Sequence, residues 1–213
     1  MNAASSAEWL DKLLITELAQ TERVARDTRQ WDLMTDCYHP DSRVFLSWFD
    51  GTAAEFIAAS KAMGEEPGGH ATHSLGPTLV RIAGDRALAD TSCAILFRRV
   101  FAGVECDMVS YCRHHSRVER VGDRWRLRSF VGVYEKNTLV PVIPGQAPAI
   151  DTGKLATFRS SYAFQSYFRA QQGKRVYDDR PGLDRPDLVA RFRDAEERWL
   201  SGEDVPLGVG AHE

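Results

Sequence analysis

The sequence predicts an α+β fold in which N-terminal helices pack on one face of a curved antiparallel sheet, with a helical C-terminal extension. Two observations predict this class. Helical patterns come first, followed by one strand and a further helix. Four long extended segments then succeed one another, separated by short turns that contain glycine. Because strands joined by tight turns pair as hairpins, this order favours an antiparallel meander with the helices gathered on one side.

Helix-start signals identify two helical stretches before the first strand. Ser5-Ser-Ala-Glu8 matches the capping box that begins a helix, and apolar residues then recur at helical spacing from Trp9 to Val24. We expect this helix to continue to about Arg29. A short second helix is expected over residues 31–38.

The first strand and a third helix follow. Pro40 disfavours helical backbone at the residue before it, so the short helix must end there. The β-branched and aromatic residues of 43–49 predict a strand, and Asp50-Gly51 predicts its turn. Thr52-Ala-Ala-Glu55 is a second capping box, which predicts a helix to about Met63.

Four extended segments make up the rest of the predicted sheet. Gly84-Asp85, Ala102-Gly103 and Gly122-Asp123 separate them and are typical of hairpin turns. The expected strands are residues 73–82, 86–101, 104–121 and 124–136.

The composition changes after residue 138. A proline-rich connection covers residues 140–148, and helices are expected over 159–172 and 186–200. The first of these helices carries four aromatic residues that a monomer rarely leaves bare: Tyr162, Phe164, Tyr167 and Phe168. We therefore expect an arm that packs on its own domain or on a neighbouring subunit, and we divide the chain into a domain of residues 1–138 and an arm of residues 139–213.

Composition excludes several classes of partner. The 213 residues are 43% hydrophobic and 27% charged, with a net charge of −3, so nucleic acid and an anionic membrane are not expected. No run approaches the length of a membrane span, and the first residues lack the basic and apolar regions of a secretion signal. The four cysteines, Cys37, Cys93, Cys106 and Cys112, show no CxxC spacing, so we expect reduced thiols in a cytoplasmic protein.

No metal or organic cofactor is expected. His70 and His73 form H-x-x-H, and His114-His115 lies two strands later, but neighbouring strand residues point to opposite faces, so only one of the latter two could join them. No nucleotide loop, dinucleotide fingerprint or flavin motif is present. The arginines of the last strands alternate with acidic residues, which is typical of a solvated, ion-paired face.

A set of short motifs spans nearly two-thirds of the chain: Ile15–Leu18, Arg26-Asp27, Trp31–Leu33, Tyr38–Val44, Gly51–Phe56, Thr72–Gly76, Gly84–Ala87 and Gly122–Leu127. With these motifs the chain resembles the SnoaL-like branch of the NTF2-like superfamily, which includes scytalone dehydratase and the lindane dehydrochlorinase. The resemblance implies the cone-shaped α+β fold of that superfamily. It says less about activity, because this fold supports many unrelated functions.

The resemblance also implies a catalytic pair. Dehydratase members pair an aspartate at a helix end with a histidine at a strand start, and Asp27 and His73 fall at those positions, His73 following a glycine-rich turn at Gly68-Gly69. Other familiar groups differ. Phe49 stands where some members carry a tyrosine, and Glu22 stands where several dehydratases have tyrosine or lysine. The group that assists the leaving group stays open between Glu22, a cysteine, His115 and a bound water.

A neutral imidazole held by a carboxylate is a general base near neutral pH. No G-x-S-x-G elbow is present, so acyl transfer is not expected; proton abstraction next to an activating group remains. Besides the pair, we expect Glu22, Trp31, Phe45, Phe49 and His115 to contact substrate. The substrate is expected to be small, apolar, aromatic or polycyclic, with few charges.

Three functions are compatible with these residues. The first is a cofactor-independent lyase, a dehydratase or dehydrohalogenase that uses His73 as base and Asp27 to orient it. The second is an isomerase or polyketide-cyclase-like enzyme with the same base. The third is a non-catalytic small-molecule-binding protein or an assembly subunit of the dioxygenase β type. Related cones associate through their open sheet face, so a homodimer or homotrimer is expected.

Overall fold

The computed structural model describes residues 5–66 and 70–209, and a six-stranded sheet forms its centre. The strands are β1 (Tyr38–Leu46), β2 (Phe49–Thr52), β3 (Ala71–Ala83), β4 (Arg86–Phe101), β5 (Val104–Val121) and β6 (Arg124–Pro141). The helices are α1 (Ser6–Asp27), α2 (Trp31–Asp36), α3 (Ala53–Glu65), α4 (Thr152–Leu155), α5 (Ala163–Gln171) and α6 (Pro186–Leu200), with a 3-10 turn η1 (Ser160–Tyr162) before α5. The turn expected at Gly68-Gly69 lies outside the described residues. None of the described helices is both long and apolar enough to cross a bilayer.

The sheet is mixed, whereas the sequence predicted an antiparallel one. Its strand order is β2-β1-β6-β5-β4-β3, and β3 to β6 form the predicted antiparallel meander. β1, however, pairs parallel with β6, with Val44 opposite Phe130 and Phe45 opposite Val131. Short turns reveal which strands are hairpin partners, but a strand reached by a long connection can insert in either direction. The sheet is open, with β2 and β3 at its edges.

The helix starts follow the predicted caps. The Ser5 side chain accepts a hydrogen bond from the backbone of Glu8, and Thr52 and Glu55 form both hydrogen bonds of a capping box. α1 ends at Asp27, two residues before the expected end, and α2 is also shorter than expected because β1 already begins at Tyr38. Pro40 therefore lies inside a strand, at an irregularity between Tyr38 and Arg43 where a missing N–H costs no ladder hydrogen bond.

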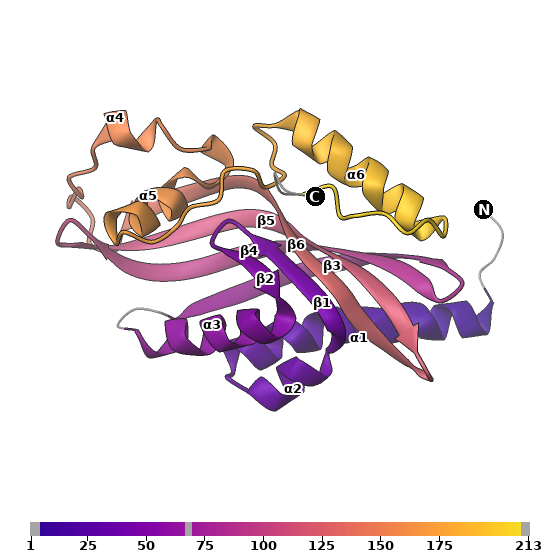
Figure 1. The fold of residues 1–213 in the computed structure, drawn as a ribbon. Helices are drawn as coiled ribbons and strands as arrows, with labels where there is room; N and C mark the ends of the chain where they lie inside the picture. Colours follow the sequence, from indigo (N-terminus) through magenta and orange to yellow (C-terminus); the bar gives the residue numbers. More distant parts are fainter. Residues whose placement is uncertain (1–4, 67–69, 210–213) are drawn as a thin grey trace.

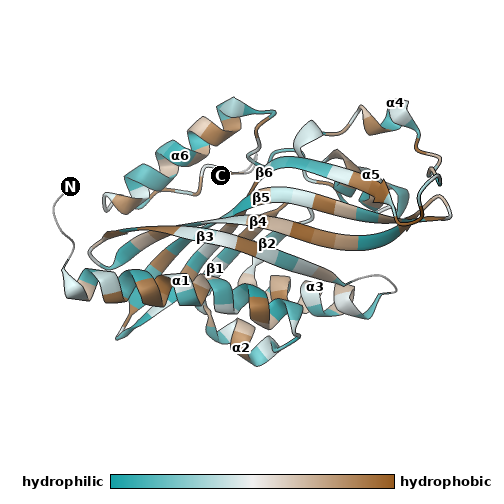
Figure 2. Ribbon diagram, turned by 180° about the vertical axis from the view of Figure 1, so that it is seen from behind, coloured by the Kyte–Doolittle hydropathy of each residue, from teal (hydrophilic) through white to brown (hydrophobic). Residues whose placement is uncertain are grey.

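Helices cover both faces of the sheet. Figure 1 shows α1, α2 and α3 on one side and α6 on the other. The core under the N-terminal helices includes Ile15, Met34, Val44, Phe56, Val118, Leu127 and Phe130. A second cluster, under α6, includes Phe45, Val131, Val133, Val189 and Phe192. Hydrophobic and hydrophilic residues alternate along α1, as Figure 2 shows, but Trp9, Leu10 and Leu13 near its start are exposed.

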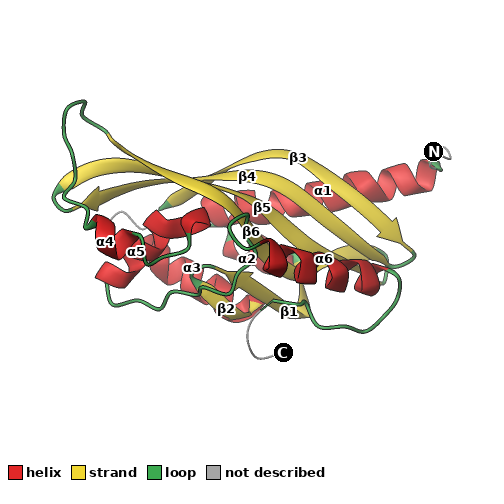
Figure 3. Ribbon diagram, turned by 90° about the horizontal axis from the view of Figure 1, so that it is seen from above, coloured by secondary structure: helices red, strands yellow, loops and turns green. Residues whose placement is uncertain are grey.

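The C-terminal arm packs on its own domain. Figure 3 shows α4 and α5 at one end of the sheet and α6 along its face. The ring of Phe168 in α5 lies 5.1 Å from that of Phe101 in β4. Before α6 the chain pairs with β6: the backbone N–H of Tyr134 donates to the carbonyl of Pro181, and that of Leu183 donates to the carbonyl of Tyr134. The arm thus satisfies backbone groups of β6 beyond the end of its pairing with β1.

One buried arginine links the segment before α6 to β1 and β2. Arg180 is fully buried, and its guanidinium donates to the carbonyl of Leu46 and to the carboxylate of Asp50, 2.7 Å away. An arginine removed from water in this way requires such partners, so the arm and the strands β1 and β2 are tied together. The division of the chain at residue 138, which falls inside β6, stays a prediction.

Candidate active site

The end of α1 and the start of β3 bring Asp27 and His73 together. One carboxylate oxygen of Asp27 accepts the backbone N–H of His73 at 2.7 Å, and the other lies 2.7 Å from the ring atom Nδ1. Because β3 begins at Ala71, its first residues run past the last turn of α1. A carboxylate at a helix C-terminus opposes the helix dipole, and these two donors offset that cost.

This geometry determines which ring nitrogen of His73 is available. A carboxylate accepts hydrogen bonds only, so Nδ1 carries the proton and Nε2 has a lone pair in the neutral ring. The His73 side chain is 4% exposed and lines a cavity, and no described residue donates to Nε2. The unprotonated nitrogen is therefore available to a molecule in that cavity.

Burial controls the charge of the pair. The pKa of His73 is lowered to about 4, first because burial disfavours the imidazolium and also because of the charges of Arg23 and Arg26, although Asp27 acts in the opposite direction. Burial by itself raises the pKa of Asp27, but the hydrogen bonds and charge of His73 outweigh it and lower that pKa below its ordinary value. At neutral pH the pair is therefore a neutral imidazole on an ionised carboxylate.

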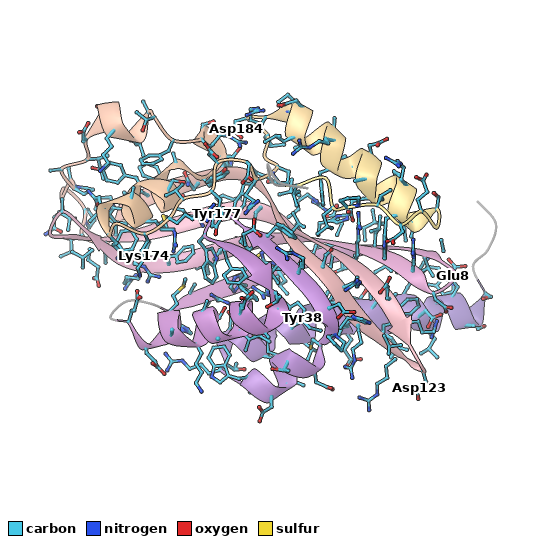
Figure 4. All side chains as sticks on the ribbon, in the orientation of Figure 1. Glu8, Tyr38, Asp123, Lys174, Tyr177 and Asp184 are labelled. Carbon is cyan, nitrogen blue, oxygen red and sulfur yellow. The ribbon has the colours of Figure 1, made fainter. Side chains whose placement is uncertain are left out.

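The cavity lies between the sheet, α1 and the arm. Its empty volume, including the opening to solvent, is about 880 Å³. Aromatic and apolar side chains provide much of its wall: Trp48, Met63, Ile95, Phe97, Met108, Phe130 and Phe168. Gln165, Phe168, Arg169, Gln172 and Lys174 bring the arm into the wall. Lys174, which follows α5 in the chain, lies between that helix and the end of α3, as Figure 4 shows.

The cavity carries far more charge than the sequence predicted. Its cationic side chains are Arg23, Arg26, Arg99, Arg169 and Lys174, against one acidic side chain, Glu66. The sequence predicts a solvated, ion-paired face for the arginines of the last strands. Arg98 fits that interpretation, because it is exposed and pairs with Asp107. Arg99, the next residue, points to the other face and is 9% exposed.

The other side chains predicted to contact substrate lie outside this cavity. Glu22 is 1% exposed and bound to Arg23 and Tyr38, so it lies in the protein core behind the wall. Phe45 and His115 face the opposite side of the sheet, where Phe45 packs in the cluster under α6 and His115 Nε2 lies 3.0 Å from Glu196. Trp31 and Phe49 pack against the core.

Strand alternation and tertiary contacts explain these differences. Phe45 alternates with Val44, which is the residue that faces the core of α1 and α3. His115 alternates in the same way with His114, which does line the cavity. Sequence pattern indicated that these pairs split between two faces, but not which face would hold the cavity. The arm residues were missed because nothing in the sequence indicates where an arm docks.

His114 and Tyr134 are cavity residues that the sequence reasoning did not select. The His114 ring lies 5.6 Å from the ring of His73, and burial lowers the pKa of His114 to about 4. Its Nδ1 is buried and has no hydrogen-bond partner in the described structure. Burial also raises the pKa of Tyr134 to about 12, so its hydroxyl stays protonated.

His114 also belongs to a cluster that could hold a metal ion. Ligand atoms of Cys93, Cys112 and His114 all lie within 4.8 Å of one another, and all three residues are buried. Thiolate and imidazole groups suit zinc, but a structural zinc site needs a fourth ligand, and the described residues supply three. This group differs from the H-x-x-H combination weighed in the sequence, and His70 and His115 take no part in it.

Comparisons with known proteins agree with the observed fold. Pea pathogenicity protein 2 of Fusarium vanettenii is 30% identical over 208 residues, which cover 93% of this chain and 89% of that protein. A hexachlorocyclohexane dehydrochlorinase of type 3 from Novosphingobium barchaimii superposes with a TM-score of 0.55 at 11% identity, covering 66% of this chain and 97% of that one. A Novosphingobium aromaticivorans protein provisionally assigned as a scytalone dehydratase superposes with a TM-score of 0.53 at 12% identity. The match covers 66% of this chain and 97% of that one.

At such low identity the two solved structures establish the fold alone. They match about two-thirds of the chain, whereas the match to the Fusarium protein extends over nearly all of it. A family model described as a SnoaL-like domain matches residues 7–131. With that match over more than half of the sequence, the chain belongs to the SnoaL-like family of the NTF2-like superfamily.

Proposed function

We propose that this protein is a cofactor-independent lyase, a dehydratase or dehydrohalogenase, in which His73 is the general base and Asp27 orients it. The observation that carries the proposal is the two-point contact of Asp27 with the backbone and ring of His73 in a cavity wall. A buried, neutral imidazole whose free nitrogen faces a cavity is suited to take a proton from carbon. The SnoaL-like fold of known dehydrochlorinases is consistent with it.

The proposed reaction is an elimination. Nε2 of His73 takes a proton from a carbon next to an activating group, and the C–H electron pair forms the new double bond. A halide then departs with its electron pair, or a hydroxyl departs as water after it receives a proton, for which the imidazolium of His73 is a source. Asp27 stabilises that imidazolium in place. A positioned base of this kind contributes about 10²–10⁴-fold to the rate.

Arg26 is the group best located to stabilise negative charge beside the base. Its side chain is 9% exposed, one Nη lies 3.7 Å from the carboxylate of Asp27, and it lines the cavity. Glu22 cannot assist the leaving group in this arrangement, because its carboxylate is held by Arg23 and Tyr38. Fixed donors aimed at developing charge act strongly in a water-poor site. In the proposed mechanism Arg26, and not Glu22 or His115, is therefore the side chain that assists the departure of the leaving group.

An isomerase using the same base is the second candidate, because the Asp27–His73 geometry does not distinguish elimination from double-bond migration. The third candidate is a non-catalytic small-molecule-binding protein or an assembly subunit. A binding protein would also have a cavity, but neither would need the Asp27–His73 pair in the cavity wall, and this pair favours an enzyme. The small-molecule substrate is common to the first two. A homodimer or homotrimer stays a prediction, and α6 covers part of the sheet face through which it was expected to form.

The test is turnover of aryl-substituted β-hydroxy and β-chloro carbonyl compounds, followed by mass spectrometry. Elimination removes water or hydrogen chloride from the mass, whereas isomerisation leaves the mass unchanged. We expect His73→Gln to abolish turnover and Asp27→Asn to reduce it by about 10²-fold or more, because the ring loses its orienting acceptor. Circular dichroism checks that both variants fold.

His39→Gln is the matched control, because His39 lies on β1 outside the cavity wall. It should retain wild-type turnover. An active His73→Gln variant would contradict the proposal, as would His39→Gln losing as much activity as His73→Gln. A product of unchanged mass that depends on His73 would transfer the assignment to the isomerase.

A further inference from the structure

Three guanidinium groups in the cavity wall lack a carboxylate of their own among residues 5–66 and 70–209. They belong to Arg26, Arg99 and Arg169. Arg26 shares the carboxylate of Asp27 with His73, and its buried Nε has no hydrogen-bond partner. Arg23, by contrast, is fully matched by Glu22. Arg99 is buried, and Arg26 and Arg169 are half-buried. Cations removed from water are ordinarily paired, so an unmatched set in one cavity indicates a missing anion.

Arg99 and Arg169 are held by carbonyl groups only. Arg99 is 9% exposed and donates to the carbonyls of His70 and Arg98. Arg169 donates to the carbonyls of Arg175 and Trp48. The guanidinium carbon of Arg99 lies 5.8 Å from the centre of the Phe168 ring, and that of Arg169 lies 5.9 Å from the centre of the Trp48 ring. These contacts hold the two guanidinium planes in place and leave their positive charges uncompensated.

The acid nearest these arginines does not neutralise them. Glu66 is bound by Lys174 at 2.7 Å, which matches one negative charge with one positive charge. Burial lowers the pKa of both Arg99 and Arg169, and the charge of Glu66 opposes that shift in each case. Counting Glu66 against Lys174, Arg99 and Arg169, this part of the cavity wall keeps two positive charges.

We infer that the substrate carries a carboxylate, and that Arg99 and Arg169 bind it from the cavity wall while its apolar body lies against Phe97, Phe168 and Trp48. This inference rests on the proposed function, because it takes the cavity of that enzyme as the binding site. It adds a substrate class: small aromatic or apolar carboxylic acids. Guanidinium groups bind carboxylates through paired, charge-assisted hydrogen bonds.

The sheet register sets the length of such a substrate. Ile95 is the residue of β4 opposite His73, and Ile95, Phe97 and Arg99 alternate onto the cavity face. Ile95 and Arg99 are four residues apart, so their backbones are separated by about 13 Å along the strand. A molecule that reaches both ends must therefore carry its carboxylate remote from the carbon that His73 deprotonates.

The test compares a carboxylate probe with its uncharged analogue. Isothermal titration calorimetry of the full chain with cinnamate and cinnamamide measures binding without requiring turnover. We expect cinnamate to bind at least about tenfold more tightly, with an affinity that falls as salt increases. Arg99→Gln and Arg169→Gln should each weaken cinnamate binding by about tenfold and leave cinnamamide binding unchanged.

Arg98→Gln is the matched control. It removes the same charge from the neighbouring residue of β4, but on the exposed face, where Arg98 pairs with Asp107. It should leave cinnamate binding unchanged. The inference is overturned when cinnamate binds no more tightly than cinnamamide, or when Arg98→Gln weakens binding as much as Arg99→Gln does.

His73→Gln separates this inference from the proposed function. The variant should bind cinnamate like the wild type, because His73 is not part of the carboxylate site. Carboxylate-selective binding by a protein without His73-dependent turnover would retain the inference and remove the proposed function. Turnover that depends on His73 but shows no preference for carboxylates, and that Arg99→Gln does not change, would retain the proposed function and overturn the inference.

Discussion

At the scale of the residue, burial determines how His73 can act. An exposed histidine is half-protonated near pH 6.5, whereas His73 is neutral at that pH because its pKa is lowered to about 4. Asp27 reduces the shift but does not cancel it, since the desolvation of the ring is the larger effect. The base is thus unprotonated throughout the physiological range. Because the imidazole of the free protein is a weak base, Asp27 is needed to stabilise the imidazolium that forms when His73 accepts a proton.

This charge state leads to a direct prediction for the free protein. The ring resonances of His73 should titrate with a midpoint near pH 4 in an NMR experiment, because the surroundings disfavour the imidazolium. Comparison with the spectrum of His73→Gln assigns the resonances. A midpoint at or above about 6.5, the value of an unperturbed histidine, would contradict the buried pair described here.

At the scale of the element, the C-terminal arm contributes to both packing and the site. α5 supplies side chains to the cavity wall, and α6 covers apolar side chains on the opposite face of the sheet. Phe192 of α6 is 2% exposed, and its ring packs edge-on against His115 at 5.1 Å. Without α6, the cluster that contains Phe45 and Val131 would be exposed to water.

Phe192→Ala therefore tests the packing of α6. We expect it to lower the free energy of unfolding by about 3–5 kcal/mol, the usual cost of removing a buried phenylalanine ring. Urea unfolding measures the change. Leu183→Ala, at a side chain that is 66% exposed, is the control and should change stability by about 0.5 kcal/mol or less. Equal small effects of both substitutions would show that α6 does not depend on this contact.

At the scale of the whole molecule, the arm and the N-terminal domain share contacts that favour unfolding as one unit. Arg180 joins the arm to β1 and β2, and Arg159 pairs with Asp184 within the arm. We expect a single urea transition that coincides for tryptophan fluorescence and far-ultraviolet circular dichroism. Two separated transitions would instead support the proposed division at residue 138 as two independent units.

The buried histidines make the whole molecule sensitive to acid. In the unfolded chain His73 and His114 bind protons near pH 6.5, whereas in the folded protein they do so only near pH 4. The unfolded state therefore binds more protons between these values, so stability should be complete above about pH 6.5 and fall as the pH falls toward 4. Each of these two pKa shifts corresponds to about 3 kcal/mol of the free energy of unfolding.

Urea unfolding at a series of pH values checks this prediction. His114→Gln removes one of the two titrating groups. The free energy of unfolding of this variant, taken relative to its value at neutral pH, should therefore fall less steeply between about pH 6.5 and 4 than that of the wild type. His39→Gln is again the control. A stability that is level across this range in the wild type would mean that neither ring is desolvated as described.

The amino-acid sequence by itself determined the local structure of this protein. Capping boxes, apolar spacing and glycine turns located the N-terminal helices and the four-strand meander, and helix α6 spans the residues expected for it. These signals are local, since they depend on residues a few positions apart. The pairing of Asp27 with His73 was predictable only through the family resemblance, because 46 residues separate them along the chain.

Only the tertiary structure decided the remaining features. It inserted β1 parallel to β6, turned Phe45 and His115 away from the cavity, and brought Arg169 and Lys174 of the arm into its wall. Alternation along a strand gives two faces but does not say which one encloses a cavity. The charge of the site, and with it the inferred class of substrate, therefore depends on packing between segments far apart in the sequence.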